Sequence, residues 1–219
     1  MTAGRHGRWW VALAVALSVC FALLAHFAIV DGVPPAFGAL LSLVPVSFLA
    51  LWAARRLPPA LALTLALAAA MALWLGWDAL KSQFAHLFFL EHAATNLLLA
   101  IVFGRTLARG GESLCTRLAR VVHGELDARE VLYTRRVTLA WTVFFAAIFM
   151  ASTVLYLGHF LAAWSLLANI ATPVLVGAMF VIEYAVRVRV LPSHAGVGIM
   201  GGIRAFSRHI GGSRYEAPR

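Results

Sequence analysis

Charged residues are scarce in this sequence, and cysteine is rarer still. Only 12% of the 219 residues are charged, whereas 62% are hydrophobic. Soluble domains average roughly 25% and 45–50%, so this composition excludes an ordinary soluble fold. The two cysteines are too few for a disulfide scaffold, a four-cysteine zinc site or a haem-attachment motif.

Apolar runs long enough to cross a bilayer make up most of the chain. A helix rises 1.5 Å per residue, so about 18 or more apolar residues cross a hydrocarbon core of roughly 30 Å. We count six such runs and predict an all-α bundle of six transmembrane helices. They cover approximately residues 9–30, 36–54, 60–77, 84–104, 137–157 and 164–186.

Arginine is unevenly distributed among the connections between these runs. Cytoplasmic loops retain positive charge, and translocated loops are depleted of it. With the N-terminus inside, the predicted cytoplasmic segments contain all 17 arginines, and the outer loops contain Lys81 alone. We therefore expect a multi-pass membrane protein with both termini in the cytoplasm. The net charge of +9 reflects this topology, and no nucleic-acid partner is expected.

The same pattern divides the chain into four segments. Residues 1–104 contain four membrane helices, residues 105–136 form a cytoplasmic segment, residues 137–186 contain two more helices, and residues 187–219 form a basic cytoplasmic tail.

The cytoplasmic segment carries local structure of its own. Apolar residues recur with helical spacing from Leu114 to Val122, and Gly124 provides a stop signal. This pattern predicts a short amphipathic helix in the headgroup layer. Asp127 and Glu130 have the spacing of a capping box, which allows the next helix to begin directly after Asp127.

The tryptophans all lie near the ends of the predicted spans. Their amphipathic rings are typical of the membrane interface, so we expect an anchoring belt. Its members are Trp9, Trp10, Trp52, Trp74, Trp77, Trp141 and Trp164.

Polar side chains within the spans are costly, at about 2.5–3.5 kcal/mol per charge. Four on the fourth span occupy an arc of about 140°, and two on the sixth span have a similar depth, so we predict that these groups face each other. A carboxylate beside an imidazole is typical of proton carriers and acid–base pairs, but interhelical hydrogen bonding explains the same residues. The cluster consists of Glu91, His92, Thr95, Asn96, Ser165 and Asn169.

Basic residues gather at the predicted cytoplasmic face. They suit anionic headgroups or an acidic protein partner, but from the sequence alone an ordinary positive-inside loop is the favoured explanation. They are Arg117, Arg120, Arg129, Arg135 and Arg136.

Signals for covalent or metal chemistry are weak. Cys115 lacks a histidine and asparagine pattern, and no histidine has partners at metal-ligand spacing. We therefore expect no metal and no cofactor, and we regard an enzyme as the less favoured class.

The second half of the chain resembles a known family. The stretches are FGRTLARGGESLCTRLARVVHGELDAREVLYTRRVTLAWTVFF (residues 103–145), WSLLANIATP from Trp164, and MFVIEYAVRVRVLP ending at Pro192. They are similar to bacterial inner-membrane proteins encoded beside fatty-acid-synthase-like genes for aryl polyene pigments of the xanthomonadin kind. The resemblance covers roughly residues 87–195. Some relatives are labelled ketosynthase, but a condensing enzyme needs a soluble layered fold with a nucleophilic cysteine, which this chain lacks.

The resemblance implies an accessory membrane subunit. Such a subunit would recruit an acidic acyl-carrier protein, or its acyl product, from the pigment or lipid biosynthesis enzymes to the lipid bilayer. Its recurrent blocks add Arg105, His123, Tyr133, Glu183 and Arg187 to the docking surface.

Two other functions stay open. A transporter or flippase for a lipid-linked product would use the polar arcs as its pathway, although six spans without a visible inverted repeat are few unless the protein forms a homodimer. An intramembrane acyl or glycosyl transferase would use Glu91 or His92 as a base.

Overall fold

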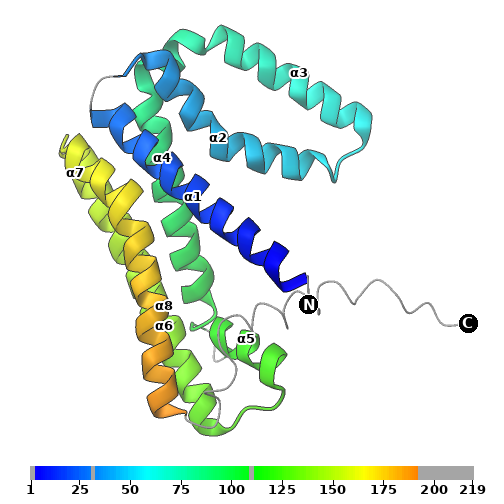
Figure 1. Cartoon of the computed structure of the whole chain (residues 1–219), viewed down its shortest axis with the longest axis vertical. Helices are drawn as coiled ribbons and strands as arrows, with labels where there is room; N and C mark the ends of the chain where they lie inside the picture. The colour runs from blue at the N-terminus through cyan, green and yellow to red at the C-terminus, as the bar shows by residue number, and fades with distance from the viewer. Residues whose placement is uncertain (1–2, 31–32, 109–110, 192–219) are drawn as a thin grey trace, which may run out of the picture. The chain divides into compact units, whose positions relative to one another are not determined.

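The computed structural model describes residues 3–30, 33–108 and 111–191, so the predicted basic tail beyond Leu191 lies outside the described residues. The described residues form helices and no strands, which confirms the all-α prediction (Figure 1). The helices are α1 (Ala3–Val30), α2 (Pro35–Ala54), α3 (Pro59–Leu75), α4 (Trp77–Arg105), α5 (Leu114–His123), α6 (Ala128–Leu157), α7 (Leu161–Leu166), the π-helix η1 (Leu167–Ala171) and α8 (Thr172–Val190).

Five helical segments among the described residues are long and apolar enough to cross a membrane. They are Leu13–Val30, Pro35–Ala54, Trp77–Arg105, Ala128–Leu157 and Leu161–Val190. The sequence predicted six spans, and the remaining apolar helix, α3, has 17 residues. Large apolar side chains such as Phe48 and Trp74 are about three-quarters exposed, as suits a surface that meets lipid. These features indicate a multi-pass membrane protein.

The helices form two compact units, each assembled from separate stretches of chain. The first unit contains Met1–Ala94 and Ala151–Pro173, and the second contains Thr95–Met150 and the residues from Val174 onward. Helices α4, α6 and α8 each contribute to both units.

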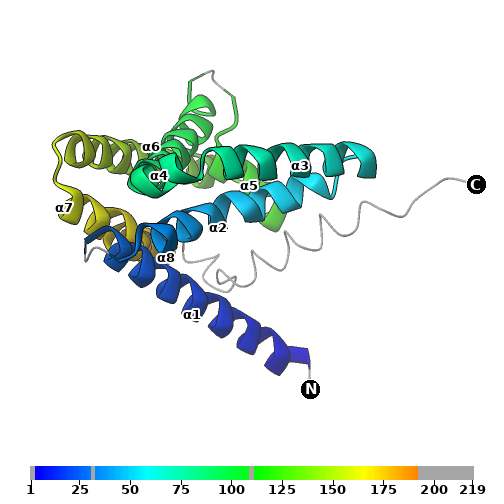
Figure 2. The same ribbon diagram turned by 90° about the horizontal axis from the view of Figure 1, so that it is seen from above.

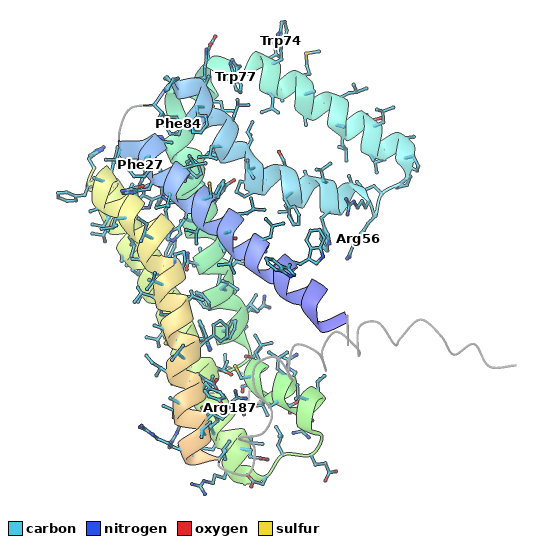
Figure 3. The ribbon with its side chains drawn as sticks, in the orientation of Figure 1. Phe27, Arg56, Trp74, Trp77, Phe84 and Arg187 are labelled. Atoms are coloured by element: carbon cyan, nitrogen blue, oxygen red, sulfur yellow. The ribbon has the colours of Figure 1, made fainter. Side chains whose placement is uncertain are left out.

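In the first unit, α1 packs against α2, α7 and η1. Its core consists of Ala25, Phe88, Tyr156 and Trp164. Gly38 on α2 permits the approach of α4, because a side chain there would meet the Phe84 ring within 2.7–2.8 Å (Figure 3). Helices α2 and α3 form a hairpin, which Figure 2 shows from above.

In the second unit, short-range signals position α5 and α6. Glu130 N–H donates to Asp127 Oδ1 at 2.7 Å, and Asp127 N–H donates to Glu130 Oε2 at 2.8 Å. This reciprocal pair confirms the predicted capping box. Helix α5 ends at Gly124, whose φ of 80° is strained for other residues, which confirms the predicted stop signal.

The predicted tryptophan belt is wrong at two positions. Trp9 and Trp10 are more than 70% exposed, as expected, but Trp164 is 0% exposed and Trp141 only 6%. Trp164 packs in the core of the first unit, and in the second unit Trp141 lies with its ring centroid 4.9 Å from that of Phe180. Proximity to a span end does not fix which face of a helix carries a residue, so these two rings pack against protein.

Candidate functional sites

A chain of hydrogen bonds surrounds His92 in the first unit. His92 Nδ1 lies 3.0 Å from Ser152 Oγ, and His92 Nε2 lies 3.3 Å from Thr172 Oγ1. Trp164 Nε1 donates to Ser152 Oγ at 2.9 Å, and Thr172 Oγ1 donates to the carbonyl oxygen of Leu167 at 2.8 Å. These hydrogen bonds thus join side chains of α4, α6, α7 and α8.

The groups at the two ends of this series of hydrogen bonds constrain the proton positions along it. The indole N–H of Trp164 only donates, and the Thr172 hydroxyl has one proton, which goes to Leu167. Thr172 therefore accepts from His92 Nε2, which places a proton on that nitrogen. In the neutral imidazole with this tautomer, Nδ1 accepts from the Ser152 hydroxyl. An indole donor and a backbone carbonyl lie at the two ends of these hydrogen bonds, which hold the helices together.

A second polar group surrounds Ser165, the residue that follows Trp164. Asn169 Nδ2 donates to Ser165 O at 3.1 Å and to Ser165 Oγ at 3.2 Å, and His26 Nδ1 lies 3.0 Å from the same hydroxyl. Asn169 belongs to η1, whose wider π-helical turn is a feature often found at functional sites. Sequence reasoning missed His26, although a histidine within an apolar span is itself a signal.

Glu91 does not join either group among the described contacts. Within the described part of the chain, its Oε1 is buried and has no hydrogen-bond partner. Thr95 is exposed rather than turned inward, and Asn96 is buried; both belong to the second unit. The four polar residues predicted on this helix spread over a wider arc than the buried face of α4. Their side chains therefore have different surroundings.

Hydroxyl groups fasten α5 to α6 in the second unit. Thr116 Oγ1 lies 2.7 Å from both Ser113 Oγ and Thr134 Oγ1, and Thr138 Oγ1 donates to Ser113 Oγ at 3.1 Å. All four hydroxyl residues are buried. Each such bond contributes about 0.5–1.5 kcal/mol. This hydroxyl cluster fixes the polar face of α5 against protein.

The opposite face of α5 is apolar and exposed. Leu118 and Val121 are 43% and 44% exposed, with the exposed Arg117 and Arg120 beside them. An exposed apolar stripe flanked by arginines is typical of a helix in the headgroup layer.

The arginines near α5 are exposed, and some of them are paired with an acidic side chain or a backbone carbonyl. Arg120 Nε lies 2.7 Å from Glu112 Oε1, and an Arg135 guanidinium nitrogen donates to the carbonyl of Leu107 at 3.0 Å. Residues 105–136 contain seven arginines and four acidic residues, an excess of 7 − 4 = 3 positive charges. The members exposed on the structure are Arg105, Arg117, Arg120, Arg129, Arg135 and Arg136.

The remaining predicted docking residues have other surroundings. Tyr133 is 9% exposed, and its hydroxyl donates to Glu183 O at 3.1 Å and Oε1 at 3.2 Å. Glu183 Oε1 lies 3.5 Å from Arg187 Nε, which Figure 3 labels on α8. Tyr133 and Glu183 therefore tie α6 to α8 rather than project from the surface. The side chain of His123 lies outside the described residues.

A groove lies between α6 and α8 in the second unit, with a volume of about 550 Å³. Its walls are mostly apolar and include Ala140, Trp141 and Met179, while Arg129 and Arg136 also line it. Sequence reasoning missed this groove, because the pattern of each helix does not reveal which faces of the two helices meet.

Nucleophilic and metal chemistry have little support in the described residues. Burial raises the pKa of the Cys115 thiol, an effect that outweighs the lowering by its hydrogen bond with Thr138. The thiol therefore stays protonated near neutral pH and is a poor nucleophile. The described residues contain no group of three or more histidine, cysteine or acidic side chains able to hold a metal ion.

Comparison with protein families, with curated proteins and with solved structures finds no match to this chain.

We predict that Ser152→Ala destabilises the protein by about 1–2 kcal/mol, because it leaves Trp164 Nε1 and His92 Nδ1 without their shared partner. The free energy of unfolding of the full chain in mixed micelles, titrated with a denaturing detergent, measures this loss. Ser18→Ala is the matched control, since Ser18 is exposed and bonds only within its own helix turn, to Ala14 O. Equal stability of the two variants would contradict a stabilising role for the hydrogen bonds of Ser152 with His92 and Trp164.

Proposed function

We propose that this chain is a bacterial inner-membrane accessory protein of lipid or aryl polyene-type assembly, which docks acyl-carrier machinery at its cytoplasmic face. The single observation that carries the proposal is the exposed arginine surface of α5 and the start of α6. The resemblance of residues 103–145 to proteins encoded beside such biosynthetic genes supplies the partner class.

The proposal includes a sixth crossing of the membrane by α3. Its 17 residues correspond to about 25 Å of helix, near the lower limit for a span. With α3 crossing, Arg55 and Arg56 lie on the cytoplasmic side and Lys81 on the outer side, which agrees with the positive-inside rule. Both termini are then cytoplasmic.

The hydroxyl cluster gives the arginine surface a fixed geometry. Its bonds hold α5 against α6, so Arg117 and Arg120 keep their places beside the exposed Leu118 and Val121. An acidic carrier protein is attracted by the excess positive charge, and an acyl chain it delivers meets an apolar surface at the membrane. Binding of this kind weakens as salt screens the charges.

We predict that the double variant Arg117→Gln and Arg120→Gln loses at least tenfold in affinity for an acyl-carrier protein at low salt. Binding to the full chain in nanodiscs, measured across a salt titration, provides the readout. Arg55→Gln with Arg56→Gln removes the same charge from another loop and should bind as the parent does. Retained, salt-insensitive binding by the first pair would refute the docking proposal.

Transport of a lipid-linked product is the second candidate, and Glu91 favours it. A buried carboxylate oxygen without a described partner is costly in a membrane, and such groups often mark transport pathways. A transferase has less support, because both ring nitrogens of His92 are engaged and the thiol of Cys115 is protonated.

We predict that Glu91→Gln blocks export and leaves synthesis intact if the chain transports its product. Lipid profiling of the inner and outer leaflets in a complemented deletion strain distinguishes these outcomes. Asp78→Asn, which removes a surface carboxylate paired with Lys81, is the control. Normal export in Glu91→Gln would remove transport through this residue.

A further inference from the structure

The groove between α6 and α8 is amphipathic along its length. On α6 its lining runs from Arg129 to Trp141, which corresponds to about 18 Å of helix. On α6 the charged and hydroxyl-bearing residues Arg129, Tyr133 and Arg136 extend over about the first 10 Å of the lining, and Ala140 and Trp141 follow, with Met179 contributed by α8. The groove therefore offers a polar end and an apolar end to one occupant.

The charge of the polar end is positive. Glu183 also lines the groove, but its carboxylate is already engaged by Arg187 at 3.5 Å and by the Tyr133 hydroxyl at 3.2 Å. Among the described ion pairs, none involves Arg129 or Arg136. Two exposed guanidinium groups are thus available for an anion, and guanidinium groups bind carboxylates in a forked geometry.

The volume of the groove matches one hydrocarbon chain. A water molecule occupies about 30 Å³ in the liquid, and a methylene group is of similar size. A groove of about 550 Å³ then holds roughly 18 such groups, which is the size of a single long acyl chain.

We propose that this groove binds a single-chain amphiphile with a carboxylate head, as a long-chain fatty acid has. The carboxylate lies between Arg129 and Arg136, and the chain extends along Ala140 and Met179 toward Trp141. The inference rests on the chemistry of the groove and not on Arg117 and Arg120. If it fails, the carrier-docking proposal still stands or falls by the binding experiment with those two arginines.

Photocrosslinking tests the proposal with the full chain in nanodiscs. The probe is an 18-carbon fatty acid that carries a diazirine on its chain, and mass spectrometry locates the labelled peptides. We expect label on the peptides that contain Trp141 and Met179. Unlabelled oleate should compete at least tenfold better than oleyl alcohol, because only the acid can pair with the arginines.

Variants separate occupancy of the groove from general lipid contact. Ala140→Phe fills the groove and should reduce labelling at least fivefold, whereas Leu139→Phe adds the same ring to an exposed position outside it. Arg129→Gln with Arg136→Gln should abolish the preference for acid over alcohol, and Arg189→Gln should preserve it. Uniform labelling of the helices, equal competition by acid and alcohol, or competition by dioleoyl phosphatidylglycerol as strong as that by oleate would overturn the proposal.

Discussion

The hydrocarbon core of a bilayer offers no hydrogen-bond partners, and this constraint governs the structure. Every backbone N–H and C=O group inside it must be bonded within the protein, which leaves helices as the spanning elements of a chain whose described residues form no strands. The same constraint acts on side chains, since a polar group buried without a partner costs several kcal/mol. The apolar side chains, in contrast, remain exposed over most of the helical surface.

Both units meet this constraint with short polar side chains that connect helices. In the first unit an imidazole and two hydroxyl groups join α4, α6 and α8 through His92. In the second unit the hydroxyl cluster of α5 and α6 uses serine and threonine alone. These bonds replace the hydrophobic effect as a source of specific helix pairing, because lipid tails are as apolar as leucine. Glu91 departs from this pattern, since within the described part of the chain its buried Oε1 has no hydrogen-bond partner.

The sequence predicted features that depend on local chemistry. Spacing along the chain predicts the all-α class, the limits of α5, the capping box of α6 and the stop at Gly124. The structure confirms these features. Features that depend on the rotation of a helix about its axis could not be predicted from the sequence. Trp141 and Trp164 satisfy the rule for interfacial anchors by position, yet their helix faces turn toward protein. The groove and the contact of His26 with Ser165 depend on pairs of faces that no single stretch of sequence specifies.

The account depends most on the sidedness of the segment that contains α5, because the docking surface needs that segment in the cytoplasm. Topology mapping with reporter fusions tests it directly, with a fluorescent protein that matures only inside and a phosphatase active only outside. Fusions after Gly124 should fluoresce, and fusions after His159 should show phosphatase activity. Phosphatase activity after Gly124 would place α5 outside the cell membrane and contradict the central claim.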